Sequence, residues 1–251
     1  RALKTAGSDV YENEGKRSGA YSAGARVHPY VLLNFKGTLD DVFTLVHEMG
    51  HSIHSYLSNT RQPTAYQDYV IFVAEVASTC NEALLMEYLL SVTTDKKERA
   101  YFNTPQQFRG TLYRQTMFAE FELRIGQLAA QGETSPPLLS REYRALNEDY
   151  FGPDMVIDDE IAWMGPDPHF YYNYYVFQYA TGFSAAVAIA NRILKEGAPA
   201  VADYKKFLSG GCSTDPISLL KIAGVDMSSP EPVNSALALF GELVDELAEL
   251  L

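Results

Sequence analysis

The chain has 251 residues, of which 47% are hydrophobic and 12% aromatic, enough for a folded core, which excludes intrinsic disorder. Its 20 Lys and Arg against 32 Asp and Glu give a formal net charge of −12, which argues against binding nucleic acid or an anionic membrane surface. The two cysteines, Cys80 and Cys212, are far apart in sequence and favour a reducing, cytoplasmic compartment over a disulfide-stapled secreted domain.

Nothing along the chain indicates repeats or a membrane span. The apolar runs, such as residues 70–74, are far shorter than a bilayer requires, and we expect no membrane association. Proline and glycine are distributed along the chain and form no obvious linker, so residues 1–251 are expected to form one catalytic domain. The chain begins at Arg1 without an initiator methionine, and we expect either a fragment or a trimmed chain.

The first expected elements are two short extended stretches within residues 17–36. They cover residues 20–23 and 30–35 and are separated by Gly24 and Pro29, which predicts a small hairpin. After Gly37 the hydrophobic period changes to that of a helix. Thr38 is suited to cap this helix, Asp40 and Asp41 fall in its first turn, and the helix is expected to run to about residue 57.

Helical periodicity dominates the rest of the chain. A second helix is expected after Pro63, reaching residue 91, and a third over residues 105–130. The later expected helices cover residues 140–150, 172–195, 198–208, 216–223 and 232–251. The predicted fold class is therefore mainly α, with one minor β-hairpin or sheet.

Three of the five histidines lie in the string HEMGHSIH, at positions 47, 51 and 54. Residues four apart on a helix stand one above the other, so His47 and His51 present two imidazoles to the same side, as one zinc ion requires. Glu48 projects about 100° around the helix from His47, where it can reach water beside the metal. The alternative is that both histidines are ordinary surface or core residues. His54 is expected either to hydrogen-bond a carboxylate or to fill space, and His28, beside Pro29, to be structural.

A catalytic zinc site with two imidazoles needs a third protein ligand, commonly a carboxylate. Glu75 is the only charged side chain between Asp68 and Glu82, and an ionised carboxylate in so apolar a stretch is costly unless it is paired or binds metal. We therefore predict Glu75 as the third ligand, the alternative being a solvated helix face. Glu82 lies seven positions later and is expected either to orient a ligating imidazole or to form a plain salt bridge.

A second group of candidate residues lies in the segment from Pro168 to Tyr179, where five tyrosines fall within nine residues. On a helix, Tyr172, Tyr175 and Tyr179 share a face. Their hydroxyls and the imidazole of His169 are suited to stabilising the oxyanion of a hydrolysis reaction. An aromatic packing seam explains the same pattern equally well.

At these residues the chain resembles oligoendopeptidase F and, more distantly, the thimet oligopeptidase family of zinc metallopeptidases. The resemblance rests on four strings in order, EGKRSGAY at 14–21, HEMGHSIH at 47–54, FVAEVASTCNE at 72–82 and HFYYNYYVFQYATG at 169–182. It implies a helical, zincin-like catalytic domain that corresponds to the carboxy-terminal part of longer family members. It also implies that one zinc ion per chain is bound by His47, His51 and Glu75, with Glu48 as general base. The same resemblance implies that His169, Tyr172 and Tyr179 contact substrate and transition state. His169 stands closer to Tyr172 than in the mammalian family members, which leaves Tyr175 as a substitute candidate.

The predicted function is hydrolysis of internal peptide bonds in short oligopeptides, with Glu48 taking a proton from water and delivering it to the leaving amine. The hairpin edge is a candidate docking edge for an extended peptide. Two other functions remain open, a zinc metallocarboxypeptidase and a helical zinc-binding fragment that turns over little without an amino-terminal half. The sequence leaves the peptide preference and the oligomeric state open.

Overall fold

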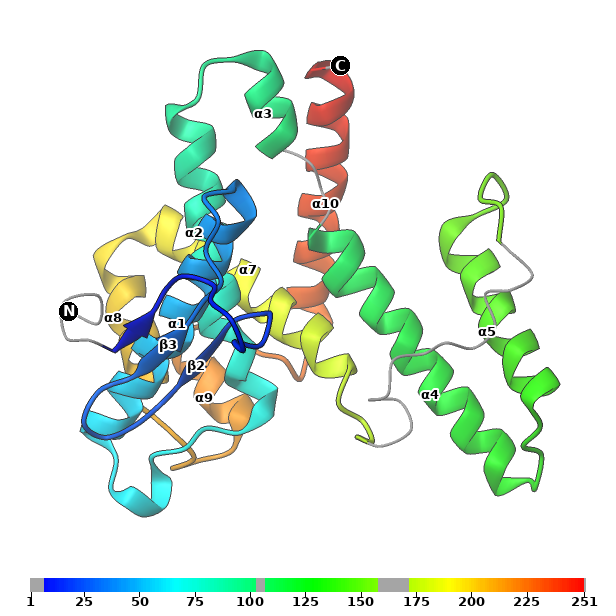
Figure 1. Ribbon diagram of the computed structural model, residues 1–251, viewed down its shortest axis with the longest axis horizontal. Coiled ribbons are helices and arrows are strands. Elements are labelled where there is room, and N and C mark those ends of the chain that lie inside the picture. The colour runs from blue at the N-terminus through cyan, green and yellow to red at the C-terminus, as the bar shows by residue number, and fades with distance from the viewer. Residues whose placement is uncertain (1–6, 103–106, 158–171, 251) are drawn as a thin grey trace. The chain divides into compact units, whose positions relative to one another are not determined.

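A computed structural model describes residues 7–102, 107–157 and 172–250 (Figure 1). The chain forms two compact units. The first contains residues 1–104 and 182–251, and the second contains residues 105–181.

A small sheet opens the first unit. It contains β1 (Ser8–Asp9), β2 (Tyr21–Ala23) and β3 (Tyr30–Leu32) in the order β1-β3-β2. β2 and β3 pair antiparallel with Ser22 opposite Val31, and β1 runs parallel to β3. The predicted hairpin and small sheet are therefore confirmed, and the short strand β1 is an addition to them. β2 lies at an edge of this sheet.

Helix α1 (Leu39–Arg61) begins where the sequence predicts and extends one turn beyond the predicted end. Thr38 caps it reciprocally, since its side-chain oxygen accepts a hydrogen bond from the backbone N–H of Asp41, whose carboxylate accepts one from the backbone N–H of Thr38. The residues that α1 buries are small or polar, namely Glu48, Gly50, Ser52, His54, Ser55 and Ser58. Packing on this helix therefore depends on close approach and hydrogen bonds more than on large apolar side chains.

The second helix starts later than predicted. Residues 64–73 form two short 3₁₀ turns, Thr64–Tyr66 and Ile71–Val73, and α2 covers Ala74–Val92. Tertiary contacts explain the difference, because the carbonyl of Tyr66 accepts from the backbone N–H of Cys212, and that of Gln67 accepts from the hydroxyl of Ser58. These carbonyls accept from donors outside residues 64–73 and so do not continue a helical ladder.

The rest of the first unit is helical. It contains α3 (Lys96–Phe102), which was not predicted, most of α7 (Phe177–Glu196), α8 (Ala198–Leu208), α9 (Pro216–Ile222) and α10 (Glu231–Leu250). The predicted positions of α8, α9 and α10 agree with the structure to within about one residue. Side chains of α2, α7, α8 and α9 form one buried apolar core, which includes Val76, Cys80, Ile189, Phe207 and Leu220. This core fixes the position of α2 within the unit.

The second unit is built from a π-helical turn (Phe108–Tyr113), α4 (Arg114–Ala130) and α5 (Pro136–Phe151). The helix expected over 105–130 is confirmed from residue 108 onwards, whereas Pro105 lies outside the described residues. Its core contains Met117, Phe118, Phe121, Tyr143, Leu146 and Val176.

The helix expected from residue 172 begins only at Phe177. Residues 172–176 form turns, and Tyr174 adopts a left-handed backbone conformation with φ of 55°, which ends helical propagation. The prediction that Tyr172, Tyr175 and Tyr179 share one helix face was therefore wrong in its geometry. Within the described residues, no helix has both the length and the apolar character needed to cross a bilayer.

The reciprocal cap at Thr38 yields a stability prediction. Thr38→Ala removes the side-chain acceptor for the Asp41 N–H and should lower the free energy of unfolding by about 1 kcal/mol. Urea denaturation checks this. Thr60→Ala, which removes an exposed hydroxyl bonded to the Tyr56 carbonyl late in the same helix, is the matched control and should change little. Equal losses for the two variants would contradict a specific role for the cap.

Candidate metal centre

The candidate metal centre brings together the three predicted ligands, His47 and His51 on α1 and Glu75 in the first turn of α2. The Nε2 atoms of the two imidazoles are 3.2 Å apart. Glu75 Oε2 lies 3.3 Å from Nε2 of His47 and 3.4 Å from Nε2 of His51. Ligand atoms about 2.0 to 2.2 Å from one tetrahedral ion are roughly 3.3 Å from each other. The spacing and the His, His, Glu donor set therefore fit a zinc ion.

Glu82 lies on the other side of the His47 ring. Its Oε1 is 2.7 Å from His47 Nδ1, so the imidazole is held between two carboxylates of α2. A carboxylate on Nδ1 fixes the ring orientation and directs Nε2 toward the ligand cluster. Of the two roles expected for Glu82, the structure supports the orienting one.

Ser78 positions Glu75 from within the same helix. Its hydroxyl lies 2.9 Å from the Glu75 backbone carbonyl and 3.0 Å from Glu75 Oε2, and can donate to either. A hydroxyl one turn away thereby limits the rotation of the ligand carboxylate. Helical periodicity does not distinguish Ser78, although a small polar residue three positions after an isolated acid is a sign of such a contact.

Gly50 allows α1 and α2 to approach closely enough to assemble this cluster. A Cβ atom at position 50 would lie 2.5 Å from Ser78 Cα and 2.6 Å from the Ala77 carbonyl oxygen, both of them backbone atoms. Asn81 adds a link between the helices by donating to the Val46 carbonyl at 3.3 Å. Gly50 was also missed, although a glycine inside a helical pattern is a sign of close packing.

Glu48 follows His47 on α1 and is not part of the His47, His51 and Glu75 cluster. Its side chain is largely buried, the residue being only 6% exposed, and its Oε2 has no hydrogen-bond partner among the described residues. Burial raises the pKa of Glu48, and the neighbouring imidazoles oppose this effect when they are charged. A buried carboxylate with an unused oxygen is suited to accept a proton from water.

The protonation of the ligands is strongly coupled. Burial lowers the pKa of His47, but hydrogen bonds and charges from Glu75 and Glu82 outweigh it and raise that pKa to about 10. Burial conversely raises the pKa of Glu75, and the two imidazoles hold it well below its usual range. Without metal, the cluster therefore retains a proton on His47 at neutral pH.

The remaining histidines have separate roles. His54 is 1% exposed and stacks on Tyr69 with ring centroids 3.6 Å apart, and its Nδ1 has no partner among the described residues. The structure thus favours the space-filling role for His54, and burial lowers its pKa to about 3. His28 lies with Nδ1 3.1 Å from the Pro29 carbonyl oxygen, as expected of a structural residue.

The tyrosine segment, here residues 172–179, belongs to the second unit, and the rings of Tyr172, Tyr175 and Tyr179 lie close together. Tyr175 contacts Tyr172 and Tyr179 edge to face, with centroids 4.7 Å and 5.2 Å away. The hydroxyls of Tyr175 and Tyr179 are 2.5 Å apart. His169 lies outside the described residues, so its predicted role stays a prediction.

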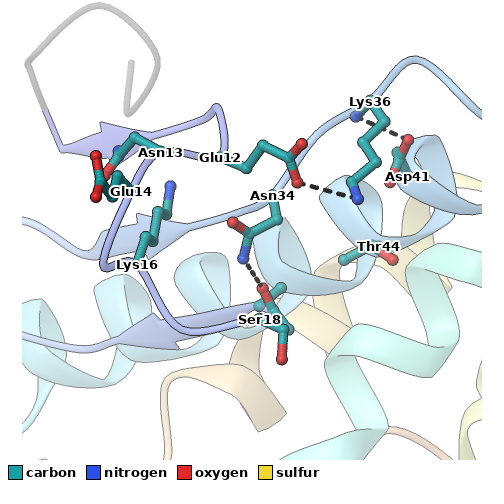
Figure 2. A pocket seen from close by; sticks show the side chains of 11 residues that line it. Glu12, Asn13, Glu14, Lys16, Ser18, Asn34, Lys36, Asp41 and Thr44 are labelled. Carbon is teal, nitrogen blue, oxygen red and sulfur yellow. Dashed lines mark hydrogen bonds and ion pairs between the residues drawn. The ribbon is translucent and has the colours of Figure 1, made fainter.

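A polar pocket of about 770 Å³ lies beside the first turns of α1 in the first unit (Figure 2). It is lined by the loop before β2 and by Asn34, Lys36, Asp41 and Thr44. Lys36 pairs with Glu12 across it at 3.0 Å, as Figure 2 shows. Thr44 is one helical turn before Glu48, so the pocket borders the stretch of α1 that carries the candidate ligands without including them.

Comparison with known proteins agrees with this geometry. Residues 4–239 match peptidase family M3. This chain belongs to peptidase family M3. The resemblance that the sequence motifs indicate is therefore confirmed, as is the mainly helical fold.

Members of the M3 family with high similarity are longer than this chain. Oligopeptidase PepF of Bacillus subtilis (strain 168) is 57% identical over 249 residues, covering 97% of this chain and 37% of that protein. The chromosomal oligoendopeptidase F of Lactococcus lactis subsp. cremoris is 48% identical over 247 residues, covering 96% and 41%. The crystal structure of oligoendopeptidase-F from Enterococcus faecium matches with a TM-score of 0.72 and 44% identity, covering 84% of this chain and 39% of that one. A solved chain from Chlamydophila abortus matches with a TM-score of 0.86 and 42% identity, covering 100% and 43%. The chain thus spans about two fifths of the length of these M3 proteins.

The close contact at Gly50 yields a prediction about the metal centre. Gly50→Ala should force α1 and α2 apart, lower the free energy of unfolding by about 1 to 3 kcal/mol and weaken zinc binding at least tenfold, because Glu75 and Glu82 both reach His47 from α2. Chemical denaturation and zinc competition with a chromogenic chelator measure the two effects. Gly126→Ala is the control, since Gly126 is exposed on α4 with open space around it and alanine should stabilise that helix by about 0.5 to 1 kcal/mol. If Gly50→Ala binds zinc as tightly as the parent, the close approach is not what assembles the ligands.

The raised pKa of His47 predicts that zinc affinity depends on pH. At pH 7 the metal-free chain holds a proton on His47 that zinc must displace, so the apparent affinity should rise by up to about tenfold per pH unit from pH 6 to 8. Chelator competition at several pH values, with calorimetry in two buffers of different ionisation enthalpy, measures the dependence and the protons released. Glu82→Gln removes a charge that raises the pKa of His47 and should flatten the dependence. Affinity that is independent of pH in the parent would show that His47 is already neutral.

Proposed function

We propose that this chain hydrolyses internal peptide bonds of short oligopeptides, with one zinc ion held by His47, His51 and Glu75 and with Glu48 as general base. The observation that carries the proposal is the convergence of two imidazole nitrogens and one carboxylate oxygen within 4.8 Å of one another, beside a buried carboxylate that is not in the ligand set. Membership of family M3 and the names of the PepF and oligoendopeptidase F relatives support a peptide substrate.

In this proposal one residue transfers the proton and two others orient the metal ligands. A zinc ion, when bound, would supply Lewis acidity that polarises a peptide carbonyl and lowers the pKa of water. Glu48 accepts a proton from the attacking water at Oε2, which has no hydrogen-bond partner among the described residues, and later donates it to the leaving amine. Glu82 keeps the His47 ring oriented, and Ser78 keeps Glu75 oriented, so neither ligand must reorganise during the reaction.

The edge strand β2 is proposed to align the peptide. It lies at the edge of the sheet and is joined to α1 by the hydroxyls of Ser22 and Ser52, which are 2.9 Å apart. Ser52 follows His51 directly, so an extended peptide added along β2 would run close to the ligand-bearing turns of α1. Gly19 and Ala20, which immediately precede β2, line the polar pocket.

The tyrosine segment is proposed to contact the peptide, following the resemblance to oligoendopeptidase F. Tyr172 and Tyr179 are the candidates, together with His169, and Tyr175 shares a hydroxyl contact with Tyr179. Of the two interpretations of this segment, the contact between the Tyr175 and Tyr179 hydroxyls supports a polar role, whereas the packing of both rings against the core of the second unit supports a structural one. Both rings can serve as packed scaffold and as hydroxyl donors.

A cytoplasmic location is part of the proposal. Cys80 and Cys212 are both free thiols, as expected in a reducing compartment. Burial raises the pKa of Cys80 to about 12, which keeps that thiol unreactive at neutral pH.

Glu48→Gln tests the general base. The substitution keeps the size of the side chain and leaves the ligands intact, so zinc should stay at one ion per chain while cleavage of a quenched fluorescent peptide falls by about 10² to 10⁴-fold. Metal analysis and initial rates measure the two outcomes, and mass spectrometry of the products distinguishes internal cleavage from stepwise loss of carboxy-terminal residues. A variant that cleaves at the parent rate would end the assignment of Glu48. A parent chain that binds zinc but cleaves nothing would identify a zinc-binding module.

A further inference from the structure

Glu122 is a buried acid outside the metal centre, within the second unit. It follows Phe121 on α4 and is buried on this helix together with Met117, Phe118 and Phe121. Glu122 is only 8% exposed, and no Lys, Arg or His among the described residues forms an ion pair with it. A carboxylate in such surroundings is costly unless another group offsets the loss of water.

The described partner of Glu122 is the backbone of the tyrosine segment. The N–H of Tyr174 donates to Glu122 Oε1 at 2.5 Å, across 52 residues of sequence. Tyr174 is also the one described residue with a side chain whose φ is positive, at 55°. The left-handed conformation is unfavourable for an aromatic residue, because its Cβ crowds the following carbonyl. A charge-assisted hydrogen bond to the same residue is suited to hold it there.

The backbone carbonyl of Tyr174 also forms a hydrogen bond. This carbonyl accepts from the side-chain amide of Gln178 at 3.2 Å, and the next residues turn into α7 through a bond from the Tyr179 N–H to the Val176 carbonyl. Val176 is buried in the core of the unit. The turn is therefore anchored by a carboxylate before Tyr174 and by the first turn of α7 after it.

The left-handed turn at Tyr174 determines how the neighbouring tyrosine side chains lie. Tyr172 precedes it and Tyr175 follows it, and their rings nevertheless meet edge to face at 4.7 Å. Tyr175 in turn contacts Tyr179 on α7 through both ring and hydroxyl. A continuous helix from residue 172 would space the same three side chains along one face, without this turn.

We propose that Glu122 is a positioning residue that holds the left-handed turn at Tyr174 and thereby sets the arrangement of the Tyr172, Tyr175 and Tyr179 side chains that contact the peptide. This inference rests on the proposed function only for the tyrosine contacts with peptide. The hold on the turn itself is a property of the second unit alone.

The test compares Glu122→Ala and Glu122→Gln in the full 251-residue, zinc-loaded chain. Hydrogen–deuterium exchange of the peptide covering residues 172–179 should accelerate at least tenfold in Glu122→Ala, because the acceptor of the Tyr174 N–H is gone. In Glu122→Gln the amide oxygen can still accept, so exchange should stay within about threefold of the parent. For the quenched fluorescent peptide, kcat should fall at least tenfold in Glu122→Ala with KM within about twofold, and Glu122→Gln should recover most of it.

Glu120→Ala is the matched control. Glu120 lies two residues earlier on α4 and also accepts from a tyrosine, the Tyr150 hydroxyl at 3.1 Å, besides pairing with Arg124. If it lowers stability as much as Glu122→Ala but leaves kcat and the exchange of residues 172–179 unchanged, general loosening of α4 is not the cause. Equal losses of kcat in both variants would overturn the positioning role.

A second route keeps the proposal falsifiable if Glu122→Ala unfolds. Glycine adopts the left-handed conformation without strain, and the Tyr174 side chain is 64% exposed, so Tyr174→Gly should reduce the dependence of the turn on the carboxylate. Glu122→Ala should therefore fold in the Tyr174→Gly background, and its loss of kcat there should be at least threefold smaller than in the parent background. Unchanged exchange in Glu122→Ala, or the same loss of kcat in both backgrounds, overturns the inference.

The two proposals fail in different ways. A zinc-loaded parent that cleaves no peptide overturns the proposed function, and the part of this inference that concerns the reaction fails with it. The exchange measurements need no turnover and decide independently whether Glu122 holds the turn.

Discussion

The close approach of α1 and α2 at Gly50 is the contact on which the candidate metal centre depends. The two histidines are fixed by their spacing on one helix, but both carboxylates that contact His47 come from α2. At Gly50 the backbone of α2 occupies the space where a Cβ would lie, and this lets Glu75 and Glu82, two turns apart, reach opposite nitrogens of one imidazole. A wider separation would leave two buried or half-buried acids without their partners, which is more costly than the loss of a single hydrogen bond.

Close packing by a small residue recurs on the side of α1 that faces the sheet. A Cβ atom at Gly24, which follows β2, would lie 2.7 Å from the Cβ and Oγ atoms of Ser55. The chain after β2 therefore packs closely against α1. Serines on the buried face compensate with hydrogen bonds, Ser52 to Ser22 and Ser55 to the Tyr69 hydroxyl at 3.0 Å. A helix held by short, directional contacts on two sides has little freedom to rotate, and its imidazoles are fixed for the same reason.

The parts of the fold that the sequence predicted are those determined locally. Thr38 and Asp41 are three residues apart and start α1 by themselves, and α8 follows from an apolar period bounded by glycine on one side. The ligand pair His47 and His51 needs only helix geometry, and Glu75 was selected because its apolar neighbours leave an ionised acid little alternative to metal or an ion pair. The roles of Gly50 and Ser78 were missed, because their importance depends on which helix lies across from them, and periodicity within one helix does not contain that information.

In both places where a predicted helix failed, a backbone group just before the observed helix forms a tertiary hydrogen bond. Before α2, the Tyr66 and Gln67 carbonyls accept from the Cys212 N–H and the Ser58 hydroxyl, and before α7, the Tyr174 N–H donates to Glu122. The Tyr66 and Gln67 carbonyls are acceptors that a longer α2 would have used, so their tertiary bonds explain its later start. The Tyr174 N–H would be free in the first turn of a helix starting at residue 172, and there it is the left-handed backbone of Tyr174 that stops the helix. The contact before α7 has the higher conformational cost, because Tyr174 is an aromatic residue held in a left-handed conformation against its steric preference. The tyrosines of this M3 chain therefore owe their arrangement to a buried carboxylate on another helix, whereas the histidines owe theirs to the regular repeat of their own.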